Sequence, residues 1–161
     1  MKAVIIMGSF KDLDYGKKVA ENLSLFGIQS ELRIASAHKT PEKVLEIIKE
    51  YEESDVVFIT IAGRSNALSG FVDANTTKPV IATPPISDKF AGMDVLSSLN
   101  MPSGVSPMVV LYAENAALAA AKILAVKYKE IEKRVREYQM RKKREIEEAD
   151  RRVKDGQRER S

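Results

Sequence analysis

The chain has 161 residues, 44% of them hydrophobic and 30% charged, which is typical of one globular domain. It contains no cysteine and one histidine, His38, so disulfide scaffolds, thiolate nucleophiles and metal sites built from cysteines or several imidazoles are excluded. No apolar run reaches the roughly 20 residues of a membrane span, and the short apolar start lacks the cleavage site of a signal peptide. We therefore expect a cytoplasmic protein without a metal.

The net charge of +3 is unevenly distributed along the chain. Residues 1–126 hold 12 Lys and Arg against 14 Asp and Glu, whereas residues 127–161 hold 14 against 9. A basic tail can bind nucleic acid, but a helix whose charged side chains face water explains the same composition. We expect neither nucleic acid nor a membrane as a partner.

Short runs of apolar, often β-branched residues predict strands, and the segments between them have the apolar spacing of helices. Residues 3–7 are continuously apolar, as in a strand buried on both faces. Residues 15–26 predict a helix with its apolar residues on one face, and Gly27 ends it.

The alternation continues along the rest of the chain. A second strand is expected at residues 30–35, and Thr40 followed by Pro41 marks a helix start, with a hydroxyl N-cap and a proline at the first helical position. Further strands are expected at residues 55–62, 79–83 and 108–112, and a short helix at residues 92–99. From Glu114 onward the chain is predicted to be one long helix.

This alternation predicts an α/β fold. We expect a three-layer sandwich, with a parallel, flavodoxin-like sheet between two layers of helices and a long C-terminal helix. In such sheets ligands bind beyond the carboxyl ends of the strands. The loops after the first four strands are therefore the expected location of a functional site.

The loop after the first strand contains Gly8, Ser9, Lys11 and Asp12. A glycine and backbone amides before a helix suit a phosphate, and Asp12 suits a sugar hydroxyl. Helix capping and turn formation explain the same residues, so both interpretations stay open at this point.

The loop after the second strand places the only imidazole, that of His38, between Ser36 and Lys39. Imidazole transfers protons near neutral pH, with an ordinary pKa of about 6.5, and Lys39 supplies positive charge for a phosphate. An ordinary surface histidine is the alternative. The position of His38 at the expected ligand edge favours a functional role.

The loop after the third strand contains Gly63, Arg64, Ser65 and Asn66. Small residues and polar donors that open a helix suit a planar polar ligand. A tight turn explains the glycine equally well, whereas the three polar residues are less easily explained as turn residues. Residues 83–87 and 97–104 are further candidate pocket walls, or plain loops.

Six segments in collinear order, spread over residues 3–126, resemble the PurE family of aminoimidazole ribonucleotide (AIR) carboxylases and mutases of purine biosynthesis. They are Met7-Gly8-Ser9 with Asp12, and residues 36–41, 62–70, 75–85, 94–104 and 115–120. The resemblance implies a nucleotide substrate. It also implies a catalytic domain over residues 1–126, with residues 127–161 as a charged helical extension of the same domain.

The family has two branches, and three features resemble the one that carboxylates AIR directly with CO2. These features are the loop of residues 62–66, Lys39 after the histidine, and Pro84-Pro85. The mutase branch, which starts from the N5-carboxylated nucleotide, typically has a Gly-Gly-Ala-Ala-His type of loop and an arginine after the histidine. The resemblance implies a carboxy-lyase that needs no ATP, metal or biotin. A mutase, or a PurE-like module that binds a nucleotide without converting it, is the alternative.

The resemblance also implies roles for individual residues, with His38 as the catalytic general acid/base. The implied phosphate contacts are Ser9, Ser36 and Lys39, the ribose contact is Asp12, and the residues around the imidazole and carboxylate are Gly63 and Ser65. The first loop departs from the family pattern, because Lys11 stands where the family has a second serine near the phosphate.

The C-terminal helix carries an apolar stripe with 4-3-4-3 spacing, made of Leu124, Tyr128, Ile131, Val135 and Tyr138. Five Glu–Arg pairs four residues apart favour the helix: Glu130–Arg134, Glu132–Arg136, Glu137–Arg141, Glu147–Arg151 and Glu148–Arg152. We expect a homo-oligomer, an octamer by resemblance, in which partner subunits cover the stripe. Packing on its own domain is the alternative, and residues 155–161 are expected to be frayed.

Overall fold

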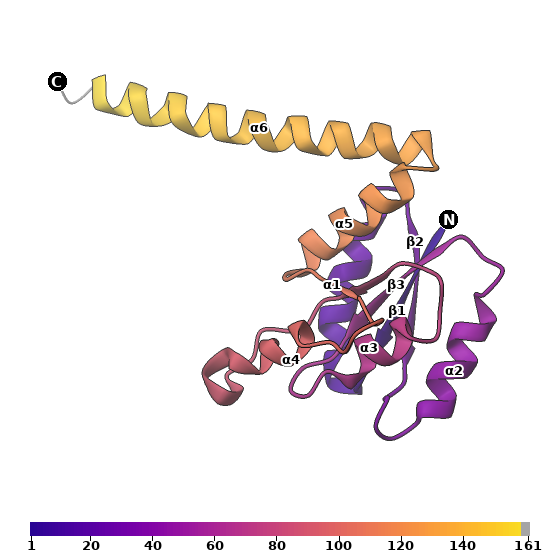
Figure 1. Ribbon diagram of the computed structural model, residues 1–161. Coiled ribbons are helices and arrows are strands. Elements are labelled where there is room, and N and C mark those ends of the chain that lie inside the picture. Colours follow the sequence, from indigo (N-terminus) through magenta and orange to yellow (C-terminus); the bar gives the residue numbers. More distant parts are fainter. Residues whose placement is uncertain (159–161) are drawn as a thin grey trace.

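A computed structural model describes residues 1–158 of the chain (Figure 1). Its five strands form one sheet in the order β2-β1-β3-β4-β5, and every neighbouring pair is parallel. The strands are β1 (Lys2–Met7), β2 (Gln29–Ile34), β3 (Val56–Ile61), β4 (Val80–Ala82) and β5 (Met108–Val109). This order confirms the predicted flavodoxin-like sheet.

Helices cover both faces of the sheet and complete the three predicted layers. One face is covered by α1 (Leu13–Ser24) and α5 (Ala113–Ala125), and the other by α2 (Pro41–Glu50) and α3 (Ala67–Asp73). Three short helices lie in the loops after β1 and β4: η1 (Phe10–Asp12), η2 (Lys89–Val95) and α4 (Leu96–Leu99). The long helix α6 (Lys129–Arg158) follows α5 and projects away from the sandwich (Figure 1).

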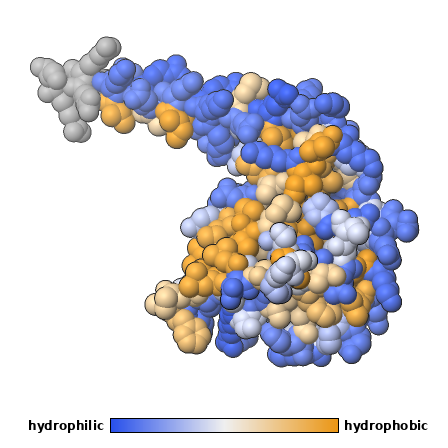
Figure 2. Space-filling model, viewed as in Figure 1, coloured by the Kyte–Doolittle hydropathy of each residue, from blue (hydrophilic) through white to orange (hydrophobic). Residues whose placement is uncertain are grey.

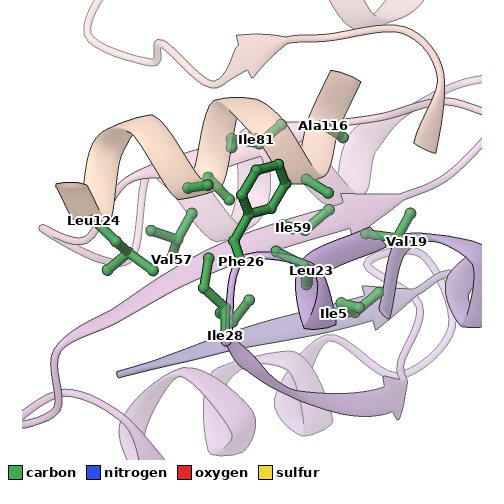
Figure 3. Close-up of a cluster of buried hydrophobic side chains, with 14 of the residues drawn as sticks. Ile5, Val19, Leu23, Phe26, Ile28, Val57, Ile59, Ile81, Ala116 and Leu124 are labelled. Carbon is green, nitrogen blue, oxygen red and sulfur yellow. The ribbon is translucent and has the colours of Figure 1, made fainter. Parts of the chain in front are cut away.

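The central strands are buried on both faces, and this explains their continuous apolar sequences. Successive residues of β1 alternate between two cores, since side chains of a strand point to opposite faces. Ile5 packs toward α1 and α5, whereas Ile6 packs toward α2 and α3. Figure 3 shows the first of these cores, in which Phe26 lies between the sheet and α5.

The end of α1 agrees with the prediction from Gly27. This glycine has a left-handed φ of 71°, which allows a close turn after the helix. The Gly27 amide donates to the Ser24 carbonyl at 2.9 Å, and the Ile28 amide donates to the Leu23 carbonyl at 3.2 Å. The chain can then enter β2 within a few residues.

The prediction of a single helix from Glu114 onward is wrong, because the chain bends between α5 and α6. At the bend, Lys127 and Tyr128 both hydrogen-bond to Asp55, which lies just before β3; the Tyr128 hydroxyl donates at 2.7 Å. These bonds attach the bend to the amino end of the sheet and direct α6 back across its own domain.

The first turns of α6 therefore pack on their own subunit. Ile131 and Val135 are buried in the α1–α5 core, and the ring centroids of Tyr138 and Phe26 lie 5.2 Å apart. Arg134 lies against Gly27. The expectation that a partner subunit covers the stripe is wrong for Ile131 and Val135, because this chain's own core covers them.

Two further expectations need correction. Among the described residues, only Glu132–Arg136 of the five expected Glu–Arg pairs lies within 4.0 Å. Glu137 contacts Lys133 instead, and Arg141 contacts Glu145. The expectation of a frayed end is wrong for residues 155–158, which continue α6. Residues 159–161 lie outside the described part.

Two loops also differ from the expected elements. The fifth strand is shorter than predicted, and Tyr112, with a φ of 71°, turns the chain into α5. The helix expected at residues 92–99 is divided into η2 and α4. The left-handed backbone of residues 90–92 interrupts η2 near its start, before the helical residues 93–99.

Candidate functional site

All seven predicted site residues lie on loops that leave one edge of the sheet. The first three strands end in register, because Met7 pairs with Ile34 of β2 and with Ile61 of β3. The loop after β4 starts beside them, where the Thr83 amide donates to the Thr60 carbonyl at 2.9 Å. We call this the carboxyl edge. Neighbouring strands lie roughly 5 Å apart, so the loops are within reach of one small ligand.

The loop after β1 forms the helix η1, and Ser9 caps it. The Ser9 hydroxyl accepts from the Lys11 amide at 3.2 Å. Asp12 follows at the start of α1, where partial burial raises the pKa of its carboxyl and a hydrogen bond with the Ser9 backbone partly offsets that rise. Lys11 is exposed. Capping thus accounts for Ser9 in this structure, as the sequence alternative allowed.

The loop after β2 is a compact turn that presents His38 and Lys39 to the surface. Thr40 precedes α2 as predicted, but its hydroxyl does not cap the helix; it accepts from the Ser36 amide at 3.0 Å. The Ser36 carbonyl in turn accepts from the Thr40 amide at 2.8 Å. These two bonds close the turn around His38, so the imidazole has a fixed attachment point at the carboxyl edge.

The loop after β3 holds Gly63 and Ser65 on either side of Arg64. Arg64 has a left-handed φ of 57°, and its amide donates to the Asp94 carboxylate at 2.9 Å. A Cβ added to Gly63 would meet its nearest atoms, in Pro85 and Asp94, at 3.6 and 3.8 Å. The chain itself therefore leaves room for a side chain at position 63.

The loop after β3 also contains a buried polar residue that the sequence-based site did not include. Asn66 is only 4% exposed, and its side-chain amide donates to the Ser98 hydroxyl at 2.9 Å. Its side-chain oxygen accepts from the Ser69 amide at 3.2 Å and caps α3. The unusual polar run 64–66 was the only signal in the sequence, since Ser98 lies 32 residues further along.

A cavity of about 550 Å³ lies between the loop after β3 and the η2–α4 segment. Its lining residues are Arg64, Ser65, Lys89, Phe90, Met93, Asp94 and Ser97. Two cations against one carboxylate give this lining a net positive charge beside the apolar side chains of Phe90 and Met93, which suits an organic anion. Of the predicted site residues only Ser65 lines this cavity; the others lie on the neighbouring loops of the same edge.

A second cavity, of about 400 Å³, lies at the opposite, amino edge of the sheet, among residues that include Lys2, Tyr51 and Asp55. Charged groups around it are paired with one another. Arg33 contacts Glu50 at 3.0 Å and lowers the pKa of its carboxyl. Hydrogen bonds from Lys127 and Tyr128 lower the pKa of Asp55. The charged side chains at this edge thus have partners within the chain.

Residues 1–158 contain no group of three or more acidic or histidine side chains arranged to hold a metal ion. Within the same range, no helix has the length and the apolar character needed to cross a membrane.

Comparison with known proteins places these features in one family. The AIR carboxylase family model matches residues 2–145. A phosphoribosylaminoimidazole carboxylase of Archaeoglobus fulgidus is 69% identical over 150 residues, covering 93% of this chain and 83% of that one. An N5-carboxyaminoimidazole ribonucleotide mutase of Methanocaldococcus jannaschii is 44% identical over 154 residues, covering 94% and 96%.

The fold comparison agrees. The crystal structure of Treponema denticola PurE has a TM-score of 0.91 and 50% identity, and the match covers 93% of this chain and 96% of that one. The predicted resemblance is therefore confirmed by family model, sequence and structure. The chain belongs to the AIR carboxylase, or PurE, family of purine-biosynthesis enzymes.

Proposed function

We propose that this enzyme joins CO2 to C4 of 5-aminoimidazole ribonucleotide and gives the 4-carboxy product, with His38 as general acid/base. The observation that carries the proposal is the position of the chain's only imidazole, exposed on the loop after β2 at the carboxyl edge. The Archaeoglobus relative, named a carboxylase, supports the direction of the reaction.

The phosphate end of the substrate fits the loops after β1 and β2. Lys39 is an exposed cation next to His38, and Ser9 and Ser36 offer hydroxyls on the same two loops. Asp12, at the start of α1, suits a ribose hydroxyl because a carboxylate accepts hydrogen bonds. Lys11 is a second exposed cation on the first loop, and it can add a contact that the usual serine of the family would not make.

The chemistry requires one proton transfer and a pocket for a small uncharged molecule. C4 of the aminoimidazole attacks the carbon of CO2, a C–C bond forms, and the negative charge moves onto a carboxylate oxygen. The C4–H bond then breaks, its proton goes to the neutral imidazole of His38, and its electrons restore the aromatic ring. A positioned base contributes about 10²–10⁴-fold. The Ser65 hydroxyl and nearby backbone amides can stabilise the new carboxylate.

The test is an ultraviolet assay of the purified enzyme with AIR, with and without added bicarbonate and without ATP. We expect turnover that rises with CO2. The Methanocaldococcus relative, named a mutase, favours a second candidate, conversion of the N5-carboxylated nucleotide. Efficient conversion of that substrate, with little response to CO2, would establish the mutase and contradict the carboxylase.

We also propose a homo-oligomer held partly by the far end of α6. Beyond Tyr138 the helix exposes Ile146 and Val153, and Val153 lies 18 residues, or five helical turns, after the buried Val135. The two exposed residues therefore continue the buried face of α6. Figure 2 shows hydrophobic residues along one side of the projecting helix. A second copy of the chain is the cover we propose. The octamer and the cytoplasmic location stay predictions.

Light scattering tests this contact. Substituting Ile146 and Val153 together by Lys should lower the particle mass. Met140→Lys should leave it unchanged, because Met140 is exposed nine residues after Ile131, on the opposite face. An unchanged mass for the double variant would show that the far end of α6 holds no subunits together.

A further inference from the structure

The η2–α4 segment holds the backbone of the loop after β3 at three points. Asp94 accepts from the Arg64 amide at 2.9 Å, and the single proton of the Ser97 hydroxyl is shared between the Arg64 carbonyl and the Asp94 carbonyl, the latter at 2.8 Å. The same Ser97 hydroxyl accepts from the Asn66 amide at 3.1 Å. Two side chains therefore fix both peptide groups of Arg64 and the amide that precedes α3.

The residue held in this way is in a costly conformation. A φ of 57° is in the left-handed region, which a residue other than glycine adopts only where its surroundings impose it. In this loop the surroundings are Asp94 and Ser97. Without them Arg64 would relax toward an ordinary φ, and Ser65 would turn with it.

The orientation of Arg64 and Ser65 matters because both line the 550 Å³ cavity, and so do Asp94 and Ser97. Asn66 adds a second connection to the same segment through its bond to Ser98. The Asn66 oxygen also accepts from the Ser69 hydroxyl at 2.9 Å, and that hydroxyl lies 2.8 Å from Thr60 of β3. The loop is thus held between the rigid sheet and α4.

We propose that Ser97 and Asp94 are positioning residues, which set the conformation of residues 63–66 and so place Ser65 for the reaction. The inference rests on the proposed function for the role of Ser65. Because the phosphate contacts lie on the other loops, loss of Ser97 should reduce kcat more than it raises KM.

The experiment compares Ser97→Ala with Ser97→Thr and with Ser106→Ala, a control at an exposed serine nine residues further along, outside the candidate pocket walls. We expect Ser97→Ala to lower kcat about 10- to 100-fold, because it leaves the Arg64 carbonyl and the Asn66 amide without the half-buried Ser97 hydroxyl, with KM within about threefold. Ser97→Thr keeps the hydroxyl and should recover most of the rate. Asp94→Asn keeps an acceptor oxygen and should likewise retain a higher kcat than Asp94→Ala. All variants should melt within a few degrees of the wild type.

Amide hydrogen exchange gives a readout that does not depend on activity. Ser97→Ala should speed exchange in the peptide that contains residues 64–66, and Ser106→Ala should not. Equal kcat and equal exchange for the two alanine variants would overturn the proposal, as would loss of kcat without rescue by threonine. A wild-type enzyme that fails to convert AIR would instead refute the proposed function, and the exchange result would still decide the role of Ser97.

Discussion

The two edges of the sheet carry different kinds of polar residue. At the amino edge, Asp55 and Glu50 are each bonded to cationic partners, and the bonds of Asp55 join the bend before α6 to the start of β3. At the carboxyl edge, the side chains of His38 and Lys39 make no hydrogen bond or ion pair within the described part of the chain. Charged side chains that pair within the chain stabilise its fold. An exposed imidazole and an exposed cation at the carboxyl edge remain available to a substrate.

The largest effect that this comparison predicts is on His38. His38→Asn should remove turnover, by at least the roughly 10²–10⁴-fold that a general base contributes, and should leave the melting temperature unchanged because the side chain is exposed. A steady-state assay with AIR measures the turnover, and a thermal melt measures the melting temperature. Activity within tenfold of the wild type would remove His38 from the mechanism and favour a protein that only binds the nucleotide.

Lys39 should come next. Lys39→Met should raise the KM for AIR about 10- to 150-fold, the range for losing a hydrogen bond to a charged group, with a smaller change in kcat. Lys11→Met is the matched comparison, since Lys11 is the other exposed cation on these loops. A larger effect for Lys11 would assign the phosphate to the first loop and make Lys39 secondary.

A substitution at Gly63 should affect the activity and leave the stability of the fold unchanged. The chain leaves ordinary contact distances around an added Cβ, so Gly63→Ala should fold and melt normally. A methyl group there would displace a substrate that approaches the backbone, and a shift near 1 Å can cost about 100-fold in rate. Gly8→Ala, where the nearest atoms are also at 3.6 Å or beyond, is a useful companion. Full activity of Gly63→Ala would place the substrate elsewhere.

The smallest effects are expected at the amino edge. Asp55→Asn should leave kcat and KM unchanged and lower the melting temperature slightly, because the pair is exposed. Hydrogen bonds from Lys127 and Tyr128 lower the pKa of the folded carboxyl below its ordinary 3.8. Its contribution is therefore complete above that value and is lost as the pH falls further. Melting curves of both proteins from pH 7 to pH 2 should converge at the acid end; a constant difference would contradict this assignment.

The sequence predicts the sheet well because local pattern decides it. Residues 3–7 are a continuous apolar run and residues 55–62 a largely apolar one, and each corresponds to an observed strand within one or two residues. Gly27 predicts the end of α1 for a similar reason, since its backbone freedom is a property of the residue itself. The loops at the carboxyl edge follow from strand order and are predictable in the same way.

Contacts between distant residues explain what the sequence does not predict. The spacing from Leu124 to Tyr138 is continuous and contains no glycine or proline, so nothing local marks the bend that the bonds to Asp55 hold. The polar run 64–66 marks Asn66 as unusual, but nothing in the sequence pairs it with Ser97, whose hydroxyl lies 3.1 Å from its amide in the folded chain. The helix-start pattern predicts Thr40 before α2 correctly. It does not predict that the Thr40 hydroxyl accepts from the Ser36 amide and leaves the helix uncapped.

The return of α6 to α1 also has a consequence for the order of folding. The contact between Phe26 and Tyr138 closes a loop of more than a hundred residues, and such closures form late because they cost the most chain entropy. During synthesis the α1–α5 core lacks the cover of Ile131 and Val135 until these residues have emerged, whereas the α2–α3 side can close much earlier. A chain stopped before residue 131 would complete the α2–α3 core but leave the α1–α5 core partly exposed.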